Sequence, residues 1–503
     1  MSKLSSGKAP SKQTEGDITL PFSIGKILAI APALVIALIM SGIYFSGIIQ
    51  MMLGHRELRE FEHEAKAIEY FNWALSANPN LAEAYSERAT AEMEIERRKG
   101  LKADYSAARS DSAQAVKLDP RNALYFENGL KIEHAALNFR KEIAGYEHLI
   151  ALEDYLRESL LNDRAGVLYI VGDFNKARAD RDSIIKVDSS KIKDTKISTY
   201  DPRSDYKERA EQYRYIGEID KAIRDYEVCV KSTPEIYDLM HLAYLYENSG
   251  RSSQALKIYS KVIEIDSNDK SKQEPSTDAD NARYRRANLY LKFGEPEKAL
   301  ADADGLIKYN EECVHRKAFR AKILGLMGRK NEAEEQRKAA LGHLTSDIND
   351  VPKNADAKTK ADTYAARADF YATTEQWKNA LKDYAISLSV EPSSLNYSEC
   401  ARIYSKIGDY DNAIKFFTKA ISSSTDYEDL KTAYNGSAQV HLSQNKPALA
   451  VEDCSKAIAL GTNDGECSYL RAKAYRMLGK NELAKIDENE ALGLEFSPLP
   501  DLL

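Results

Sequence analysis

The sequence predicts an all-α chain, in which a single transmembrane helix precedes a right-handed α-solenoid of helix-turn-helix repeats. Two observations carry this prediction. An alanine, usually a glycine seven residues later, and a second alanine five residues after that recur in nine units between residues 161 and 495. Near the amino terminus, 27 consecutive residues from Ile27 to Leu53 carry no charge. A solenoid of short helical hairpins offers mainly extended surface to other proteins.

The amino terminus is predicted to be a disordered tail followed by a membrane anchor. Residues 1–23 are polar, with Ser, Lys, Gly and Pro, and cannot bury a core. Residues 24–53 are long enough to span a bilayer with some tilt. They exceed the apolar core of a signal peptide, and no convincing small-residue cleavage site follows. We therefore favour an uncleaved single span, with a cleaved signal sequence as the alternative.

The charges that flank the span decide its orientation only weakly. Four lysines precede the span, and three basic residues follow it: Lys3, Lys8, Lys12 and Lys26, then Arg56, Arg59 and Lys66. The excess of positive charge before the span slightly favours an amino terminus inside the cell. The repeats would then lie on the extracytoplasmic side, which is periplasmic in a bacterium.

Residues 57–160 are predicted to form degenerate helical units of the same kind. A proline follows the second alanine by twelve residues at Pro234 and Pro392, where it ends a helix. The same spacing joins Ala67 to Pro79 and Ala108 to Pro120. Residues 121–160 lack the signature, but the 69 residues from Ala108 to Ala177 are close to two periods, so we count one unit there.

Residues 161–495 carry the nine regular units, and each signature position has a physical reason. Both alanines lie where two helices approach closely, and the glycine ends the first helix in a left-handed conformation. Glu375 and Asn445 replace the glycine in two units. The first alanines are Ala165, Ala210, Ala243, Ala287, Ala321, Ala368, Ala401, Ala438 and Ala472, and the second are Ala177, Ala222, Ala255, Ala299, Ala333, Ala380, Ala413, Ala450 and Ala484.

This pattern resembles the tetratricopeptide repeat, whose period is about 34 residues. The resemblance covers roughly residues 60–495. It implies a concave face lined by the first helix of each hairpin, which binds extended peptides or partner helices. Three long intervals between hairpins are polar, and we expect loops at Ser189–Ser204, Ser267–Asp280 and Gly342–Lys360.

An arginine and an aspartate recur at fixed positions and suggest an ion pair within each hairpin. Arg precedes the first alanine in six units, and Asp follows the second alanine by three residues in six units. Five units have both, and two carry apolar residues at both positions, as Leu242 and Ile258 do. We therefore expect a partly buried structural contact between the two helices.

The resemblance places candidate groove residues one position after the first alanine. The final units are rich in basic and amide side chains there or on the same side, and we expect a protein-binding groove at Lys322, Arg402, Lys406, Gln439, Lys473 and Arg476. Such a groove would suit an acidic segment or a C-terminal carboxylate. Ordinary solvated charges are the alternative. The full Lys and Asn clamp of the chaperone-binding members of the family is missing.

Composition argues against several function classes. The formal net charge is −7, and no basic stripe indicates nucleic-acid binding. Five scattered cysteines form no Cys-x-x-Cys pair, so we expect neither a zinc site nor a redox site. No phosphate-binding loop or catalytic motif is present. We expect no cofactor, no metal, no small-molecule substrate and no catalytic residue.

The combined prediction is a membrane-anchored, non-catalytic scaffold that binds other proteins, with a short tail at residues 496–503. Two alternatives remain open. One is an adaptor or regulatory subunit of a membrane-associated enzyme, and the other is a receptor for protein import or translocation.

Overall fold

The computed structural model describes residues 50–54, 56–57, 63–153, 155–193, 202–269, 274–308, 313–352, 354–461, 465–494 and 496. Its regular secondary structure over these residues is helical throughout, without strands. The predicted tail 1–23, nearly all of the predicted anchor 24–53, and the last tail after Phe496 lie outside them. None of the described helices is both long and apolar enough to cross a membrane.

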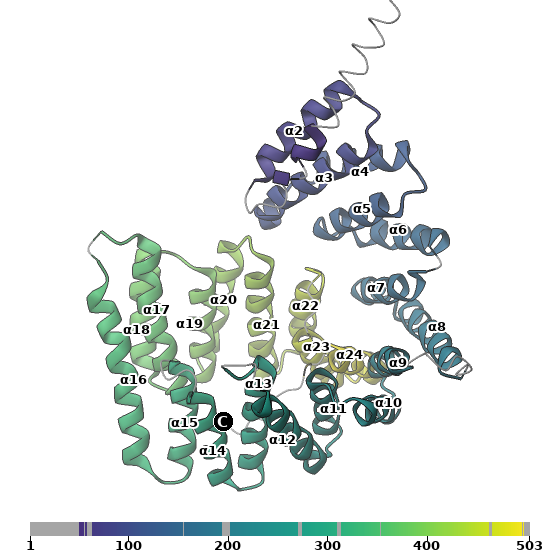
Figure 1. Ribbon diagram of the computed structural model, residues 1–503. Coiled ribbons are helices and arrows are strands. Elements are labelled where there is room, and N and C mark those ends of the chain that lie inside the picture. The colour runs from purple at the N-terminus through teal and green to yellow at the C-terminus, as the bar shows by residue number, and fades with distance from the viewer. Residues whose placement is uncertain are drawn as a thin grey trace, which may run out of the picture. The chain divides into compact units, whose positions relative to one another are not determined.

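Nine consecutive helical hairpins occupy the region of the regular repeats (Figure 1). Within each hairpin the two helices pack side by side. The pairs are α7 (Arg157–Ile170) with α8 (Phe174–Lys193), α9 (Arg203–Tyr215) with α10 (Ile219–Ser232), α11 (Ile236–Asn248) with α12 (Ser252–Asn268), α13 (Thr277–Lys292) with α14 (Pro296–Ile307), α15 (Val314–Leu326) with α16 (Lys330–Asp350), α17 (Ala357–Thr373) with α18 (Trp377–Val390), α19 (Ser394–Lys406) with α20 (Tyr410–Ser423), α21 (Tyr427–Ser443) with α22 (Pro447–Ile458), and α23 (Gly465–Met477) with α24 (Asn481–Gly493). The prediction of an all-α repeat solenoid is confirmed.

The signature alanines are the close-packing points of these hairpins. All eighteen are buried, with at most 3% of their surface exposed. A larger side chain there would push the two helices of a hairpin apart, because protein interiors are close-packed.

The turn between the helices is left-handed in every one of the nine hairpins. The seven signature glycines have φ between 73° and 83°, and Glu375 and Asn445 adopt φ of 61° and 57° in the same place. The turn therefore keeps its conformation without glycine. Leu137 has φ of 54° between α5 (Ala123–Ala135) and α6 (Phe139–Leu152), so this earlier hairpin turns in the same way.

The predicted ion pair is confirmed in all five units that carry both residues. Each guanidinium binds its aspartate through Nε and Nη2, with nitrogen–oxygen distances of 2.5–3.0 Å. The pairs are Arg164–Asp180, Arg209–Asp225, Arg286–Asp302, Arg367–Asp383 and Arg471–Asp487. In one of the two units that carry apolar residues instead, Leu242 is buried in a core cluster and Ile258 packs against that cluster.

A further ion pair of this type joins two earlier helices. Arg88 on α3 (Ala82–Arg97) binds both oxygens of Asp111 on α4 (Ser106–Leu118), at 2.5 and 2.8 Å. These residues are 23 positions apart, whereas the regular pairs are 16 apart. The longer turn, which includes the short helix η1 (Gly100–Lys102), accounts for the difference.

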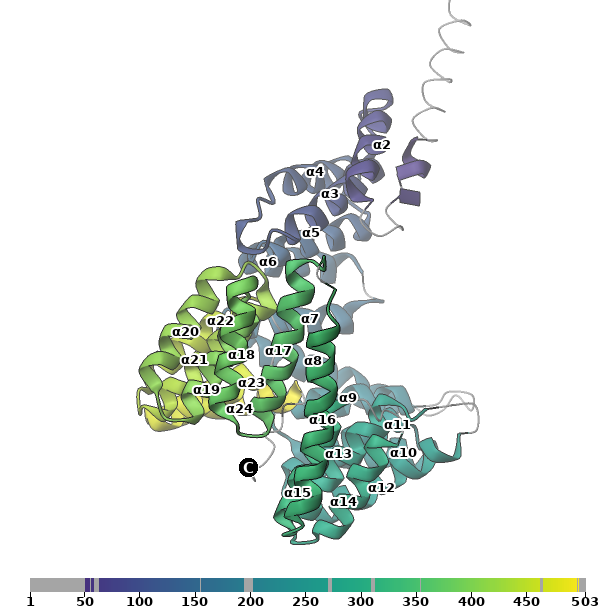
Figure 2. The same ribbon diagram turned by 90° about the vertical axis from the view of Figure 1, so that its left-hand side faces the viewer.

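The expected loop at Gly342–Lys360 is wrong over most of its length. Residues up to Asp350 continue α16, which is 21 residues long and green in Figure 2, and α17 begins at Ala357. Leu344 is buried in a core cluster with Phe370 of α17. This apolar contact extends the helix beyond the length of a regular unit. The loop predicted at Ser189–Ser204 likewise begins as helix, because α8 runs to Lys193.

The chain divides into two compact units. Among the described residues, the first comprises those up to Glu92 together with 110–120 and contains α2 (Glu64–Ala77), and the second comprises 93–109 and those from Arg121 onward. Within the second unit α9 packs against α24, so the beginning and the end of the hairpin array are in contact (Figure 1).

Candidate functional site

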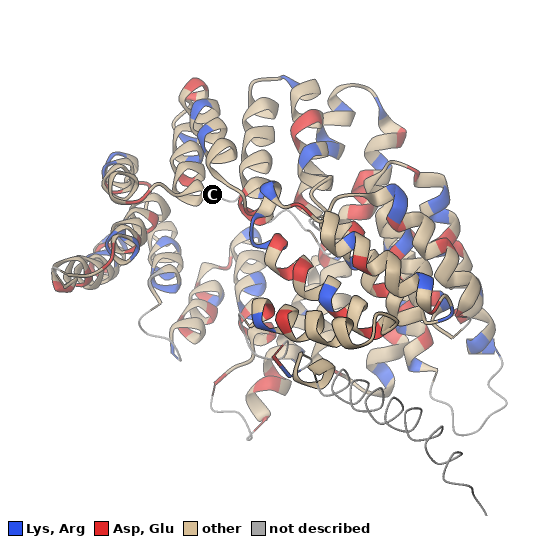
Figure 3. Cartoon of the chain, turned by 90° about the horizontal axis from the view of Figure 1, so that it is seen from above, with Lys and Arg blue, Asp and Glu red and all other residues tan. Residues whose placement is uncertain are grey.

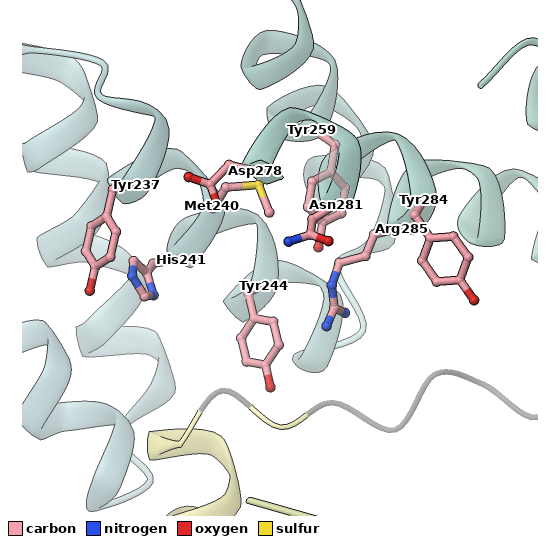
Figure 4. Close-up of a pocket in the computed structure, with 9 residues that line it drawn as sticks. All are labelled: Tyr237, Met240, His241, Tyr244, Tyr259, Asp278, Asn281, Tyr284 and Arg285. Atoms are coloured by element: carbon pink, nitrogen blue, oxygen red, sulfur yellow. The ribbon is translucent and has the colours of Figure 1, made fainter. Parts of the chain in front are cut away.

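A pocket of about 320 Å³ opens between α11 and α13, the first helices of two consecutive hairpins (Figure 4). Helix α12, which joins them, contributes one wall residue. The lining residues are Tyr237, Met240, His241 and Tyr244 of α11, Tyr259 of α12, and Asp278, Asn281, Tyr284 and Arg285 of α13. Four tyrosine rings and a methionine thus surround a small number of polar groups.

The first helix of each hairpin is called its A helix, and the two A helices α11 and α13 line this pocket with residues at equivalent positions. Relative to the first alanine of its hairpin, α11 uses the residues six, three and two positions before and one position after. Helix α13 uses the same three positions before its own alanine. Residues with these spacings share one helix face. The pocket therefore results from the stacking of two successive hairpins, since the first helix of each supplies one row of lining side chains.

A buried tyrosine and an arginine are held together on one side of the pocket. The Tyr259 hydroxyl donates to Glu247 Oε2 at 2.6 Å, and Arg285 Nη1 lies 3.3 Å from the same oxygen. Burial, and then the charge of Glu247, raise the pKa of the Tyr259 phenol, so it stays a donor at neutral pH. The Arg285 guanidinium also lies 5.2 Å from the ring centroid of Tyr244.

His241 links the pocket to the far end of the array. Its ring is 4.1 Å, centroid to centroid, from that of Tyr237, and its Nδ1 lies 2.9 Å from Arg214 Nη1. Arg214 in turn donates from Nη2 to the carbonyl oxygen of Gly493, the last residue of α24, at 2.5 Å. The wall of the pocket therefore depends on the contact between α9 and α24.

The chemistry of the pocket suits one large side chain of a bound segment. Its volume lies at the lower limit for ligand pockets in proteins. Tyrosine rings supply rigid apolar area with a polar edge, a combination that is common at protein-binding surfaces. Asn281, Asp278 and Arg285 offer hydrogen-bonding groups beside those rings.

The residues predicted for a basic groove lie on α15, α19, α21 and α23, apart from this pocket. Basic and acidic residues are interspersed along the helices (Figure 3). Arg476 binds both oxygens of Glu488 at 2.5 and 2.6 Å, and Gln439 Nε2 donates to Glu466 at 2.9 Å. Internal partners therefore engage these two groups.

The remaining predicted groove residues are less strongly engaged. Arg402 lies 3.7 Å from Glu399 on its own helix, and Lys473 is exposed. Partial burial, opposed by Glu375, lowers the pKa of Lys322, and the nearby charge of Lys406 lowers it further. The structure thus brings Lys322 and Lys406 within electrostatic reach of one another.

Sequence reasoning missed the tyrosine pocket because it considered one position per repeat. Tyr244 occupies that one position in its repeat, since it follows Ala243 directly. The other lining residues of α11 lie three, four and seven residues before Tyr244. Reading the whole face of each A helix would have shown that aromatic residues gather on these two repeats.

Comparison with known proteins identifies the repeats. Family models described as tetratricopeptide repeat match residues 239–269, which fall in α11 and α12, and residues 397–431, which begin in α19. The chain therefore contains tetratricopeptide repeats.

A curated relative and two solved structures show similarity over longer stretches. The chain is 24% identical over 220 residues to "DnaJ homolog subfamily C member 3" of Gallus gallus, covering 43% of this chain and 37% of that protein. The crystal structure of yeast Tom70 aligns with 14% identity and a TM-score of 0.34, over 88% of this chain and 96% of that one. A tetratricopeptide repeat protein from Parabacteroides merdae aligns with 18% identity and a TM-score of 0.29, over 54% and 98%.

Proposed function

We propose that this protein is a non-catalytic scaffold that holds an extended segment of another protein on the A-helix face of its repeats. The observation that carries the proposal is the pocket between α11 and α13, which is lined from equivalent positions of two successive A helices. The segment would place an aromatic or large apolar side chain among Tyr237, Tyr244 and Tyr284. Asn281 and Arg285 would hydrogen-bond its backbone.

The tetratricopeptide repeats support a protein partner rather than a small molecule. A stack of hairpins presents a continuous surface, whereas a single small pocket supplies only one anchor. We propose that the basic side chains of Lys322, Lys406 and Lys473 add an electrostatic contribution farther along the bound segment. This contribution would favour acidic partners and fall with rising ionic strength.

We further propose that residues 24–53 anchor the scaffold in a membrane, with the repeats on the extracytoplasmic side. The support is the uncharged run from Ile27 to Leu53 and the slight excess of lysine before it. Tethering would restrict the scaffold to partners that reach the membrane.

Site-directed photocrosslinking in native membranes tests the binding proposal. A benzophenone amino acid replaces Tyr237, which is half exposed at the rim of the pocket. The same replacement at Tyr155, which is 96% exposed and does not line the pocket, is the matched control. We expect discrete crosslinked partners at position 237 that are absent at position 155.

A pocket variant makes this experiment specific. Tyr284→Ala in the chain that carries the crosslinker should remove the crosslinks, because it deletes one ring of the pocket and leaves the signature alanines intact. Equal crosslinking from both positions, or crosslinks that persist in Tyr284→Ala, would refute binding at this site. The identity of the partners then separates a client-binding scaffold from an enzyme subunit or an import receptor.

A further inference from the structure

Three carboxylates from three consecutive helices converge at the junction between two hairpins. Glu158 lies on α7, Asp188 on α8 and Glu208 on α9. One oxygen of each lies within 4.8 Å of the oxygens of the other two. Glu158 and Glu208 are half-buried, and Asp188 is completely buried. The cluster is therefore a partly enclosed acidic site and not a solvated surface patch.

Asp188 is the unusual member of this cluster. Neither of its carboxylate oxygens accepts a hydrogen bond from any described residue, although the side chain has no exposed surface. A buried carboxylate without hydrogen bonds is unfavourable unless another group compensates its charge. Burial, and then the neighbouring Glu208 carboxylate, raise the pKa of Asp188 to about 7.

One lysine faces the cluster, but its single positive charge does not balance the three carboxylates. The Lys191 ammonium lies 2.5 Å from Glu158 Oε2, 3.7 Å from Asp188 Oδ1 and 3.9 Å from Asp205 Oδ1. In the part of the chain that the structure describes, no other basic side chain lies within 4.0 Å of Glu158, Asp188 or Glu208. A single positive charge thus stands against three converging carboxylates, with Asp205 close by.

We propose that Glu158, Asp188 and Glu208 bind a divalent cation, with Ca²⁺ as the preferred ion. Carboxylate oxygens are ligands for hard cations, and an ion about 2.4 Å from each oxygen permits oxygen pairs up to about 4.8 Å apart. Calcium tolerates irregular coordination, whereas Mg²⁺ demands a near-ideal octahedron. Ligands from three separate helices favour the more tolerant ion.

In the site without an ion, the Lys191 ammonium supplies the positive charge beside Glu158 and Asp188. Its side chain is 38% exposed, so the ammonium can move into solvent when a divalent ion enters. The bound ion would then cross-link the α7–α8 hairpin to α9, the first helix of the next hairpin. This role is independent of the binding proposal, because none of the three ligands lines the tyrosine pocket.

Calcium-dependent stability of the full-length protein in detergent tests the proposal. After treatment with a chelator, the thermal unfolding midpoint and the heat of binding are measured with CaCl₂ and with MgCl₂. We expect saturable binding of one Ca²⁺ per chain, a higher unfolding midpoint, and a smaller response to Mg²⁺. Asp188→Asn should abolish the response to Ca²⁺.

The same variant separates metal binding from simple misfolding. Without calcium, Asp188→Asn should be at least as stable as the wild type, because it removes a buried and unsatisfied charge. Glu218→Gln, which changes an acid on the neighbouring hairpin outside the cluster, should keep the full calcium response. A wild type that does not respond to millimolar Ca²⁺ would overturn the proposal, as would an Asp188→Asn chain that responds equally.

Discussion

The hydroxyl of Tyr169, on α7, donates a 2.7 Å hydrogen bond to Oδ1 of Asp487, on α24, across 318 positions of sequence. Asp487 is already engaged in the recurring ion pair of the last hairpin with Arg471. Arg471 Nη2 lies 3.2 Å from the same hydroxyl oxygen, and Ser468 Oγ lies 3.0 Å from it. At this end of the array, the recurring ion pair is therefore extended by Tyr169 to join the array's first and last hairpins.

Tyr169→Phe should weaken this contact between the first and last hairpins without disturbing either hairpin. The substitution keeps the ring that packs against Phe174 and removes the donor to a buried carboxylate. A hydrogen bond to a charged group contributes about 2 kcal/mol, so we expect a loss of that size in the free energy of unfolding. Hydrogen exchange should rise in α23 and α24. Tyr404→Phe is the control, since its hydroxyl bonds to no other described residue.

Replacing both residues of a recurring Arg–Asp pair by apolar residues should be tolerated, whereas replacing only one of them should destabilise the fold. Arg286→Leu alone leaves Asp302 buried without its partner, which should cost about 3 kcal/mol of unfolding free energy. The double variant with Asp302→Ile should recover to within about 1 kcal/mol of the wild type, because volume and burial are restored. Denaturant unfolding of the two single variants and the double variant measures this coupling.

The α11–α12 hairpin provides a natural precedent for this exchange. It already carries Leu242 and Ile258 at the two positions, in one core cluster. Additive effects of the two single substitutions would contradict a direct interaction between Arg286 and Asp302.

Local features of this fold could be predicted from the sequence because their partners are close along the chain. The arginine and aspartate of each pair are 16 residues apart, so one hairpin turn of fixed length specifies the contact. Arg88 and Asp111 escaped the pattern because the turn between them is longer. Their chemistry is the same, but their spacing is not.

The contact between Tyr169 and Asp487 could not be predicted in this way. It depends on the small rotations that accumulate over nine hairpins, including the lengthened helix α16, and no local signature records that sum. The tyrosine pocket lies between these extremes. Its positions repeat along the chain, but its shape requires two neighbouring A helices to be placed together.

The left-handed turns should be stabilised by glycine wherever another residue now occupies them. Glu375 adopts φ of 61°, a conformation that costs a non-glycine residue about 1 kcal/mol. Glu375→Gly should therefore raise the free energy of unfolding by about that amount. The same change at Glu334, inside α16, should lower it by about 1 kcal/mol, because glycine weakens a helix interior. Thermal unfolding of both variants shows whether glycine stabilises the turn and destabilises the helix, as expected. A loss of stability in Glu375→Gly would contradict the argument.

The contact of His134 with its neighbours should weaken as the pH rises. Its Nδ1 lies 3.1 Å from both carboxylate oxygens of Glu142, which is buried, and its ring abuts the turn at Gly461. The hydrogen bond to Glu142 raises the pKa of His134 above its ordinary value of 6.5, although burial opposes this. Because the folded state binds the proton more tightly, the stabilisation is complete below about pH 6.5. It is lost as the pH rises through the higher pKa of the folded state.

Hydrogen exchange at about pH 6 and pH 8, corrected for the intrinsic rate, tests whether stability falls as the pH rises. The relevant region is the contact between the α5–α6 hairpin and the turn after α22. Protection of α5, α6 and residues 459–461 should fall at the higher pH. His134→Gln keeps a donor near Glu142 but cannot become charged, so its protection should not change between the two conditions. If the wild type were instead better protected at the higher pH, the neutral imidazole would be the stabilising form and the charged pair with Glu142 would be excluded.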